Sequence, residues 1–208
     1  MNAFARATRH LAKDPVLRRV IKRHGPCALV PRNLSPYESL VRAIAHQQLH
    51  GKAAESILAR FVALNGGVRY PTPSEVLALR PAAMRRCGFS AAKVKAIRDI
   101  ARHAKKGVVP TKRACMTLSD EALIERLTAI WGVGRWTVEM LLIFTLGRED
   151  VLPVDDFGVR EGFRRAYGMK KQPTPKALRE FGTRWAPYRS VAAWYFWRVA
   201  GEPKKRAT

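Results

Sequence analysis

The sequence predicts an all-α protein with two helical lobes and a cleft between them. Apolar residues recur at helical spacing along most of the chain, and no alternating strand-like pattern exceeds a few residues. Ser, Thr and Pro precede several of the apolar runs, at positions typical of helix starts. A chain of 208 residues that is 47% hydrophobic can bury a core, either as one domain or as two small ones.

The first helix we expect begins at Ser35-Pro36, because Ser caps a first turn well and Pro fits the first helical position. Leu40, Val41 and Ile44 repeat at helical spacing up to about His46. Further helices are expected over residues 51–64, 74–79, 81–87 and 90–104, and Asn65-Gly66-Gly67 ends the first of these.

In the second half, Ser119 is expected to start a helix, and residues 135–146 are apolar enough to form a central core helix. Two more helices are expected over residues 174–185 and 187–201. The whole chain, 1–208, is interpreted as one functional unit. One lobe covers about 36–150, and the other combines residues 1–35 with 151–208, so that both termini share a lobe.

The composition excludes several classes of protein. The most apolar stretch, Met140 to Leu146, is far shorter than the ~18 residues of a membrane span, and the N-terminus has no apolar run typical of a secretory signal. The three cysteines form no CxxC pair, which argues against a zinc ribbon and fits a reducing compartment. We therefore expect a cytoplasmic protein with no membrane partner.

The net charge of +23 indicates a polyanionic partner, most commonly nucleic acid. The charge is uneven along the chain. Residues 80–113 contain eleven basic residues and one acid, and residues 160–208 contain thirteen basic residues and three acids. Residues 114–150 instead carry three basic and six acidic residues. Solvated helix faces could produce part of this pattern, but a uniformly basic RNA-packing protein would not contain such an acidic segment.

A hairpin between two apolar helices lies in that acidic segment. Gly132-Val133-Gly134 permits a tight turn with positive φ, and its backbone N–H groups beside the next helix could bind a phosphate. A plain helix-to-helix turn would explain the two glycines equally well.

The longer pattern is more specific. The run from Leu127 to Thr137 resembles the helix-hairpin-helix of DNA repair glycosylases, and Leu152-Pro-Val-Asp-Asp-Phe-Gly resembles the catalytic aspartate loop of that superfamily. With the Tyr37–Leu49 segment, the resemblance covers about 35–201. Within the superfamily the chain looks most like the bacterial DNA-3-methyladenine glycosylase II family, in a compact form that lacks the N-terminal β domain.

The resemblance implies that Asp156 is the catalytic carboxylate, with Asp155 as the second candidate. In members that act on alkylated bases the aspartate precedes an apolar residue, as Asp156 precedes Phe157, whereas alignment to endonuclease III-like members selects Asp155. Either carboxylate could also cap the helix that begins near 156.

The residue before Thr137 determines the expected reaction type. Members that also cleave the strand have a lysine there, which forms a Schiff base with the sugar, whereas this chain has Trp136. We therefore expect no lyase activity. The Trp136 ring could stack on a flipped cationic base, and the resemblance places Tyr37 and Trp197 at the same pocket. Core packing is the alternative for Trp136, and the role of Trp197 is more ambiguous.

Gln47-Gln48-Leu49-His50 lies at an expected break between helices, where Gln48 or Leu49 could act as the wedge that fills the space left by a flipped base. A simple turn would have the same composition.

By resemblance, Gln47, Gly132, Val133, Gly134 and Thr137 bind the DNA backbone. Lys93, with Arg85 and Arg86, flanks residues 87–90, which resemble a second backbone-contacting loop, although each of these basic residues fits a solvated helix face better than a specific contact.

The resemblance also implies that no cofactor is required, although the main-chain carbonyls of Thr128, Ile130 and Val133 could hold Na⁺ or K⁺. The expected function is a monofunctional DNA glycosylase of base excision repair that hydrolyses the N-glycosidic bond of alkylated purines. The alternatives are a non-catalytic DNA-binding protein and a glycosylase for another lesion. We expect a monomer that binds double-stranded DNA in the bacterial cytoplasm, associated with the nucleoid.

Overall fold

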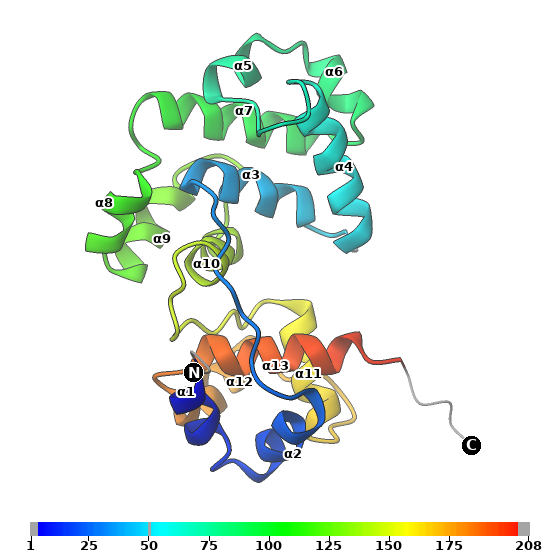
Figure 1. Cartoon of the computed structure of the whole chain (residues 1–208), viewed down its shortest axis with the longest axis vertical. Helices are drawn as coiled ribbons and strands as arrows, with labels where there is room; N and C mark the ends of the chain where they lie inside the picture. Colours follow the sequence, from blue (N-terminus) through cyan, green and yellow to red (C-terminus); the bar gives the residue numbers. More distant parts are fainter. Residues whose placement is uncertain (1–3, 50, 204–208) are drawn as a thin grey trace. The chain divides into compact units, whose positions relative to one another are not determined.

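A computed structural model of the chain describes residues 4–49 and 51–203. Within these residues it contains thirteen α-helices and one short 3-10 helix, and no strand (Figure 1). The predicted all-α class is therefore confirmed. His50, which falls in the predicted break between two helices, lies outside the described residues. No helix among the described residues has the length and apolarity needed to cross a membrane.

The chain divides into two compact units. The central unit is residues 31–146, and the terminal unit combines residues 1–30 with 147–208. Both ends of the chain therefore belong to the terminal unit, which is completed by the last helix.

The central unit is built around one helix that packs against two others. The helix α3 (Pro36–His46) lies against α7 (Ala91–Lys105) and α10 (Arg135–Phe144) (Figure 1). Leu40, Ile44, Ile97 and Leu141 are fully buried in these helices. The helices of this unit are α3 (Pro36–His46), α4 (Gly51–Ala63), α5 (Pro73–Ala78), α6 (Pro81–Arg86), α7 (Ala91–Lys105), α8 (Lys112–Thr117), α9 (Asp120–Thr128) and α10 (Arg135–Phe144).

The start of α3 agrees with the sequence prediction. Ser35 accepts a hydrogen bond from the Glu38 N–H, and the Glu38 carboxylate accepts one from the Ser35 N–H, which completes a capping box with Pro36 at the first helical position. The helix ends at His46, and its C-terminal end leads into the predicted wedge.

The terminal unit is built around two helices, α11 (Phe157–Ala166) and α13 (Arg189–Gly201), which pack against each other at a glycine. A Cβ on Gly162 would lie 1.9 Å from the Phe196 carbonyl oxygen, so only glycine allows this approach. Phe163, Trp185 and Phe196 fill the adjoining core with ring contacts. The elements of this unit are α1 (Ala5–Leu11), α2 (Pro15–His24), α11 (Phe157–Ala166), α12 (Pro175–Gly182), η1 (Thr183–Trp185) and α13 (Arg189–Gly201).

Candidate active site

The candidate catalytic carboxylate is fixed by two donors. Asp156 is the N-cap of α11, and its Oδ1 accepts hydrogen bonds from the Val159 N–H and from Trp197 Nε1, both at 2.8 Å. Trp197 extends from α13, so the two helices that pack together hold this carboxylate. Asp155 is exposed in the preceding turn, and the helix-capping role foreseen for one of the two carboxylates belongs to Asp156.

Gly158 makes room for this pair, a role that sequence reasoning missed. A Cβ at this position would lie 2.8 Å from Trp197 Cδ1 and 3.2 Å from Asp156 Oδ1. Both distances are shorter than an ordinary carbon contact, so any larger residue would push the indole and the carboxylate apart. The glycine next to the Asp-Phe pair is the only sequence signal for this role.

The loop that carries Asp156 is attached to the first turn of α13. Ser190 is fully buried, and its hydroxyl donates to the Arg148 carbonyl at 2.7 Å and accepts the Val151 N–H at 2.9 Å. Arg189 forms a bidentate pair with Asp150 at 2.7 and 2.9 Å. Burial alone would raise the pKa of Asp150, but the hydrogen bonds from Arg189 outweigh it and lower that pKa. One helix therefore anchors the loop and supplies the indole that holds its carboxylate.

The predicted hairpin joins α9 and α10 in the central unit. Gly132 has φ +82°, and a Cβ there would lie 2.7 Å from the Cβ of Ala96 on α7. The Trp131 N–H donates to Asp99 Oδ2 at 2.9 Å, so α7 supports the turn at two points. Burial would raise the pKa of Asp99, but the Trp131 N–H and Arg102 outweigh it and lower that pKa.

The backbone N–H groups of the hairpin differ in whether they could donate to a bound phosphate. The Val133 N–H donates to the Ile130 carbonyl at 3.1 Å, and the Thr137 N–H donates to the Gly134 carbonyl at 2.9 Å. Gly132 and Gly134 are exposed, and Gly134 is the N-cap of α10 with no side-chain capping bond. A phosphate at this helix start would therefore be bound first by the two glycines.

Gln47 holds the hairpin from within the central unit. Its Nε2 donates to the Gly132 carbonyl at 3.2 Å and to Thr137 Oγ1 at 3.1 Å. Beyond it, Gln48 has φ +55° and Leu49 is 40% exposed. The side chains predicted as a wedge are therefore on the surface, next to a residue attached to the hairpin turn.

The three predicted pocket rings lie in different surroundings. Tyr37 is buried in the central unit, where its hydroxyl donates to the Pro71 carbonyl at 3.2 Å and burial raises its pKa. Trp136 is half-buried at the start of α10, and Trp197 is half-buried in the terminal unit. Base stacking by these rings remains a prediction, and the structure assigns Tyr37 to the core of its unit.

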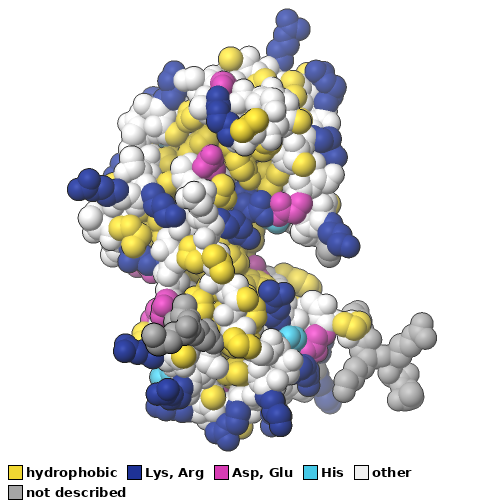
Figure 2. Space-filling view, in the orientation of Figure 1, with side chains coloured by type: hydrophobic (Ala, Val, Ile, Leu, Met, Phe, Trp, Pro, Cys, Tyr) yellow, Lys and Arg dark blue, Asp and Glu magenta, His cyan; other side chains and the backbone are white. Residues whose placement is uncertain are grey.

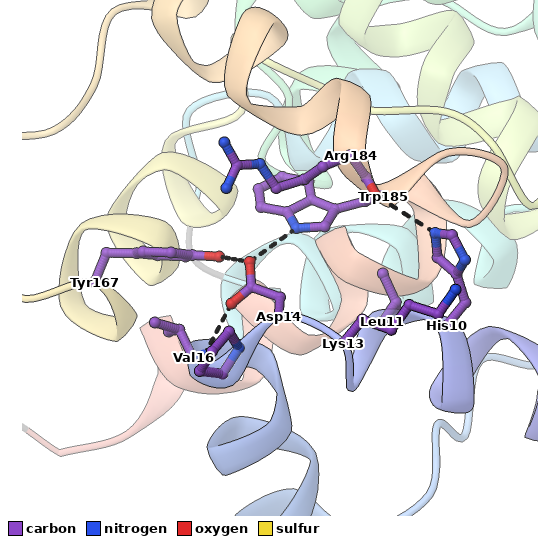
Figure 3. A pocket seen from close by; sticks show the side chains of 9 residues that line it. His10, Leu11, Lys13, Asp14, Val16, Tyr167, Arg184 and Trp185 are labelled. Atoms are coloured by element: carbon purple, nitrogen blue, oxygen red, sulfur yellow. Dashed lines mark hydrogen bonds between the residues drawn. The ribbon is translucent and has the colours of Figure 1, made fainter.

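A separate pocket in the terminal unit contains none of the predicted site residues. It has a volume of about 390 Å³ and is lined by residues of α1, α2 and η1 together with Tyr167 (Figure 3). Asp14 at its base accepts from the Val16 and Leu17 N–H groups, from Tyr167 Oη at 2.5 Å and from Trp185 Nε1 at 3.5 Å. Since both oxygens of Asp14 are already bonded, we interpret this carboxylate as structural.

Positive charge dominates the surface of both units. Figure 2 shows Lys and Arg side chains spread over the visible face, with few acidic side chains among them. Lys95 Nζ lies 4.2 Å from the ring centroid of Trp131, which is 43% exposed beside the hairpin. The exposed hairpin amides therefore have a cation next to them.

Comparison with known proteins agrees with these features. Residues 41–187 match the model of the HhH-GPD superfamily of base excision DNA repair proteins. The chain is 47% identical over 165 residues to DNA-3-methyladenine glycosylase 1 of Schizosaccharomyces pombe, covering 79% of this chain and 72% of the relative. It is 28% identical over 186 residues to DNA-3-methyladenine glycosylase 2 of Escherichia coli, covering 85% and 62%.

Among solved structures, the chain matches the S. pombe 3-methyladenine DNA glycosylase Mag1 in complex with abasic DNA. The TM-score is 0.89 with 44% identity, and the match covers 93% of this chain and 96% of the other. The helical hairpin, the capping aspartate and these matches together establish that the chain belongs to the HhH-GPD superfamily of base excision DNA repair proteins.

Proposed function

We propose that this chain is a monofunctional DNA glycosylase that hydrolyses the N-glycosidic bond of alkylated purines, of the 3-methyladenine and 7-methylguanine type, and leaves an abasic site. The observation that carries the proposal is the Asp156 carboxylate, held by the Val159 N–H and the Trp197 indole. The names of the relatives from S. pombe and E. coli support the substrate class.

The proposed chemistry needs one carboxylate and one water. As the bond from C1′ to the base nitrogen breaks, its electron pair leaves with the base and positive charge develops on the sugar. The ionised Asp156 stabilises that charge, and the oxygen of the water bonds to C1′ while its proton passes to the carboxylate or to solvent. A purine alkylated at N3 or N7 is already cationic and leaves as a neutral base, so no general acid is required.

Each unit has its own task in this reaction. In the central unit the exposed Gly132 and Gly134 amides would bind phosphate, and Leu49 or Gln48 would fill the space left by a flipped base. The Trp136 ring would stack on the cationic purine, since aromatic faces attract cations. The terminal unit would supply the carboxylate. Because Trp136 occupies the place at which strand-cleaving members have a lysine, hydrolysis would occur without strand cleavage.

The test is base release from methylated duplex DNA, measured by chromatography of the liberated bases. Wild type should release methylated purines, and Asp156→Asn should release none while keeping its affinity for a duplex with a tetrahydrofuran abasic analogue. Asp155→Asn is the matched control and should retain activity. If wild type releases no base at all, the chain is a non-catalytic DNA-binding protein. A different released base would identify another lesion preference.

Strand cleavage tests the monofunctional assignment separately. The product strand should remain intact until it is treated with alkali. Nicking by wild type without alkali, together with a borohydride-trapped covalent complex, would contradict hydrolysis by water alone.

A monovalent cation at the hairpin is a further part of the proposal. The main-chain carbonyls of Thr128, Ile130 and Val133 are neutral oxygen donors, which suit Na⁺ or K⁺ better than a divalent ion. Ile130 and Val133 are buried, and the Ile130 carbonyl accepts a hydrogen bond from the Val133 N–H. A carbonyl oxygen has two lone pairs, so it can accept this bond and also bind a cation. The cation would fix the turn and take no part in bond cleavage. DNA affinity should then be higher in K⁺ or Na⁺ than in tetramethylammonium at equal ionic strength.

We also propose that the protein acts as a monomer on double-stranded DNA in the nucleoid of a bacterial cytoplasm. Light scattering of the free protein and of its complex with a short duplex would test the stoichiometry, which should be one chain per lesion. Fluorescence imaging of a tagged chain would test the localisation.

A further inference from the structure

The segment after α3 is connected to α7 by a lysine that does not extend freely into solvent. Lys93 Nζ donates to the Ala45 carbonyl at 2.9 Å and to the Gln47 carbonyl at 2.8 Å. These are carbonyls at the C-terminal end of α3, where a helix leaves acceptors unsatisfied and where a positive charge is favourable. Lys93 itself begins in the first turn of α7, where its N–H donates to Ser90 Oγ.

The same short segment is connected to the hairpin by Gln47. The backbone carbonyl of Gln47 accepts from Lys93, and its side-chain amide donates to the Gly132 carbonyl and to Thr137 Oγ1. Thr137 is buried, with 1% of its surface exposed, so one of the two acceptors lies inside the unit. One residue therefore links the end of α3, the start of α7 and the turn before α10.

The backbone just beyond Gln47 is held in a sparsely populated conformation. Gln48 has φ +55°, and no other non-glycine residue among those described has a positive φ. Such a conformation is unfavourable for a residue with a Cβ and persists only where neighbouring contacts impose it. The contacts that hold this backbone are those of Gln47, together with a hydrogen bond from the Leu49 N–H to the His46 carbonyl at 3.2 Å.

We propose that Lys93 and Gln47 are positioning residues that hold the Gln48-Leu49 segment in a fixed register with the Gly132–Gly134 turn. This inference rests on the proposed function, because it assigns the two exposed side chains to DNA. Leu49 and the turn would then reach the duplex as one preorganised element, so that binding of a phosphate by the turn also places the wedge at the base stack. Lys93 would act through this segment and would touch neither base nor sugar.

Burial lowers the pKa of Lys93, because desolvation disfavours the charged ammonium form. Lys105, near the other end of α7, is exposed, and its ammonium group makes no hydrogen bond or ion pair with the described residues. Lys105 is therefore a matched control on the same helix. Its substitution removes one positive charge but leaves the connection between α7 and the Gln48-Leu49 segment intact.

The test uses the full chain and two duplexes. One carries a methylated purine for single-turnover base release. The other carries a tetrahydrofuran abasic analogue with 2-aminopurine beside it, whose fluorescence reports insertion of a side chain into the stack. Lys93→Met should slow base release by roughly 10- to 100-fold, the range expected when a positioned group moves by about an ångström. Its affinity for the abasic duplex should match that of Lys105→Met, while its fluorescence change should be reduced.

A double-mutant cycle with Leu49→Ala separates positioning from general damage to the fold. If Lys93 acts through the wedge, Lys93→Met should have little further effect once Leu49 is alanine. Lys93→Arg, which keeps the charged donors, should recover part of the rate. The proposal would be overturned if Lys93→Met slowed base release equally in the wild-type chain and in the Leu49→Ala chain. It would also be overturned if Lys93→Met kept the wild-type rate and the wild-type fluorescence change.

A second variant covers the case in which Lys93→Met does not fold, as judged by its thermal melting. Gln47→Glu keeps the shape of the side chain but removes its N–H donors to Gly132 and Thr137, and it should give the same loss of fluorescence change. The fluorescence arm involves no bond cleavage. Failure of wild type to release bases would therefore count against the proposed function, and an unaltered fluorescence change in both variants would count against the positioning role.

Discussion

Asp156 Oδ1 and Trp197 Nε1 are 2.8 Å apart, and this hydrogen bond connects the first residue before α11 to the last turns of α13. The same oxygen accepts the Val159 N–H, so the carboxylate is oriented both by its own helix and by a neighbouring one. A carboxylate that must face the sugar in one orientation benefits from both constraints.

Replacing Trp197 by Phe should slow base release while leaving DNA affinity nearly unchanged. The substitution keeps an aromatic ring but removes the donor to an ionised group, an interaction worth about 1.5–3 kcal/mol, which corresponds to roughly 10- to 150-fold in rate. Single-turnover kinetics on a methylated duplex would measure this. Trp194→Phe on the same helix is the control and should stay close to wild type. Equal rates for the Trp197 variant and wild type would show that the indole does not orient the carboxylate.

Adding a methyl group at Gly158 should disturb the same pair from the other side. The new Cβ would lie 2.8 Å from Trp197 Cδ1, so the indole must shift away from Asp156. We expect Gly158→Ala to lose at least about tenfold in base release, as expected for a displacement of a fraction of an ångström. Gly201→Ala provides the comparison, since nothing lies within 4 Å of a Cβ there. Wild-type activity in Gly158→Ala would contradict the close packing.

The hairpin glycine should be needed for binding as well as for stability. Gly132→Ala combines a φ of +82° with a Cβ contact of 2.7 Å to Ala96, so the turn must move. We expect weaker binding to an abasic-analogue duplex and a fall of more than about 1 kcal/mol in the free energy of unfolding. Gly66→Ala has a similar φ, +77°, and open space around its Cβ. It should lose stability alone, and a matching loss of affinity would argue against a local role of the hairpin.

The stability contributed by Asp14 should depend on pH in the acidic range. Burial alone would raise its pKa, but the hydrogen bonds from Tyr167, the Val16 and Leu17 N–H groups and Trp185 lower it. Because the pKa is lower in the folded chain, this stabilisation is present above the unfolded pKa of about 3.9 and is lost as the pH falls below it. Asp14→Asn, which keeps a side-chain acceptor but removes the charge, should therefore lower the free energy of unfolding more at pH 7 than at pH 3, as measured by urea unfolding. Glu180→Gln, an exposed site, should show no such difference.

Affinity for undamaged DNA should fall steeply with salt. The chain carries a net charge of +23, and each neutralised phosphate contributes about −0.9 to the slope of log K against log salt. Asp156→Asn should keep the same slope as wild type, because the carboxylate makes no phosphate contact in the proposed mechanism. A flat salt dependence would contradict the electrostatic origin of binding.

Local signals in the sequence predicted much of this fold. Ser35-Pro36 predicted the start of α3, and the glycines at 132 and 134 predicted the hairpin between α9 and α10. The helices α1, α2 and α8 were missed. The start of α2 carries the same kind of signal, since Asp14 caps the helix and Pro15 occupies its first position. That helix could have been predicted with the rule already applied at Ser35.

The parts of the site that could not be predicted depend on contacts between distant residues. Lys93 was expected to lie on a solvated helix face beside a loop that resembles a backbone-contacting loop, and its ammonium group donates to carbonyls 46 and 48 residues away in the sequence. The predicted DNA contact of Gln47 stays a prediction, and its side-chain amide also holds the hairpin, which the sequence does not indicate. Gly158 matters only because Trp197 lies against it. No periodicity or spacing encodes these contacts, because they arise only once helices have packed.

The terminal unit is assembled from residues 1–30 and 147–208, with the central unit between them in sequence. During translation, the residues of the hairpin and the wedge leave the ribosome before Trp197 and the last turns of α13 are made. Domains generally fold as units while synthesis proceeds. A nascent chain can therefore complete its central unit while Trp197, the donor to Asp156, is still missing. The order of synthesis places the completion of the terminal unit after that of the central unit.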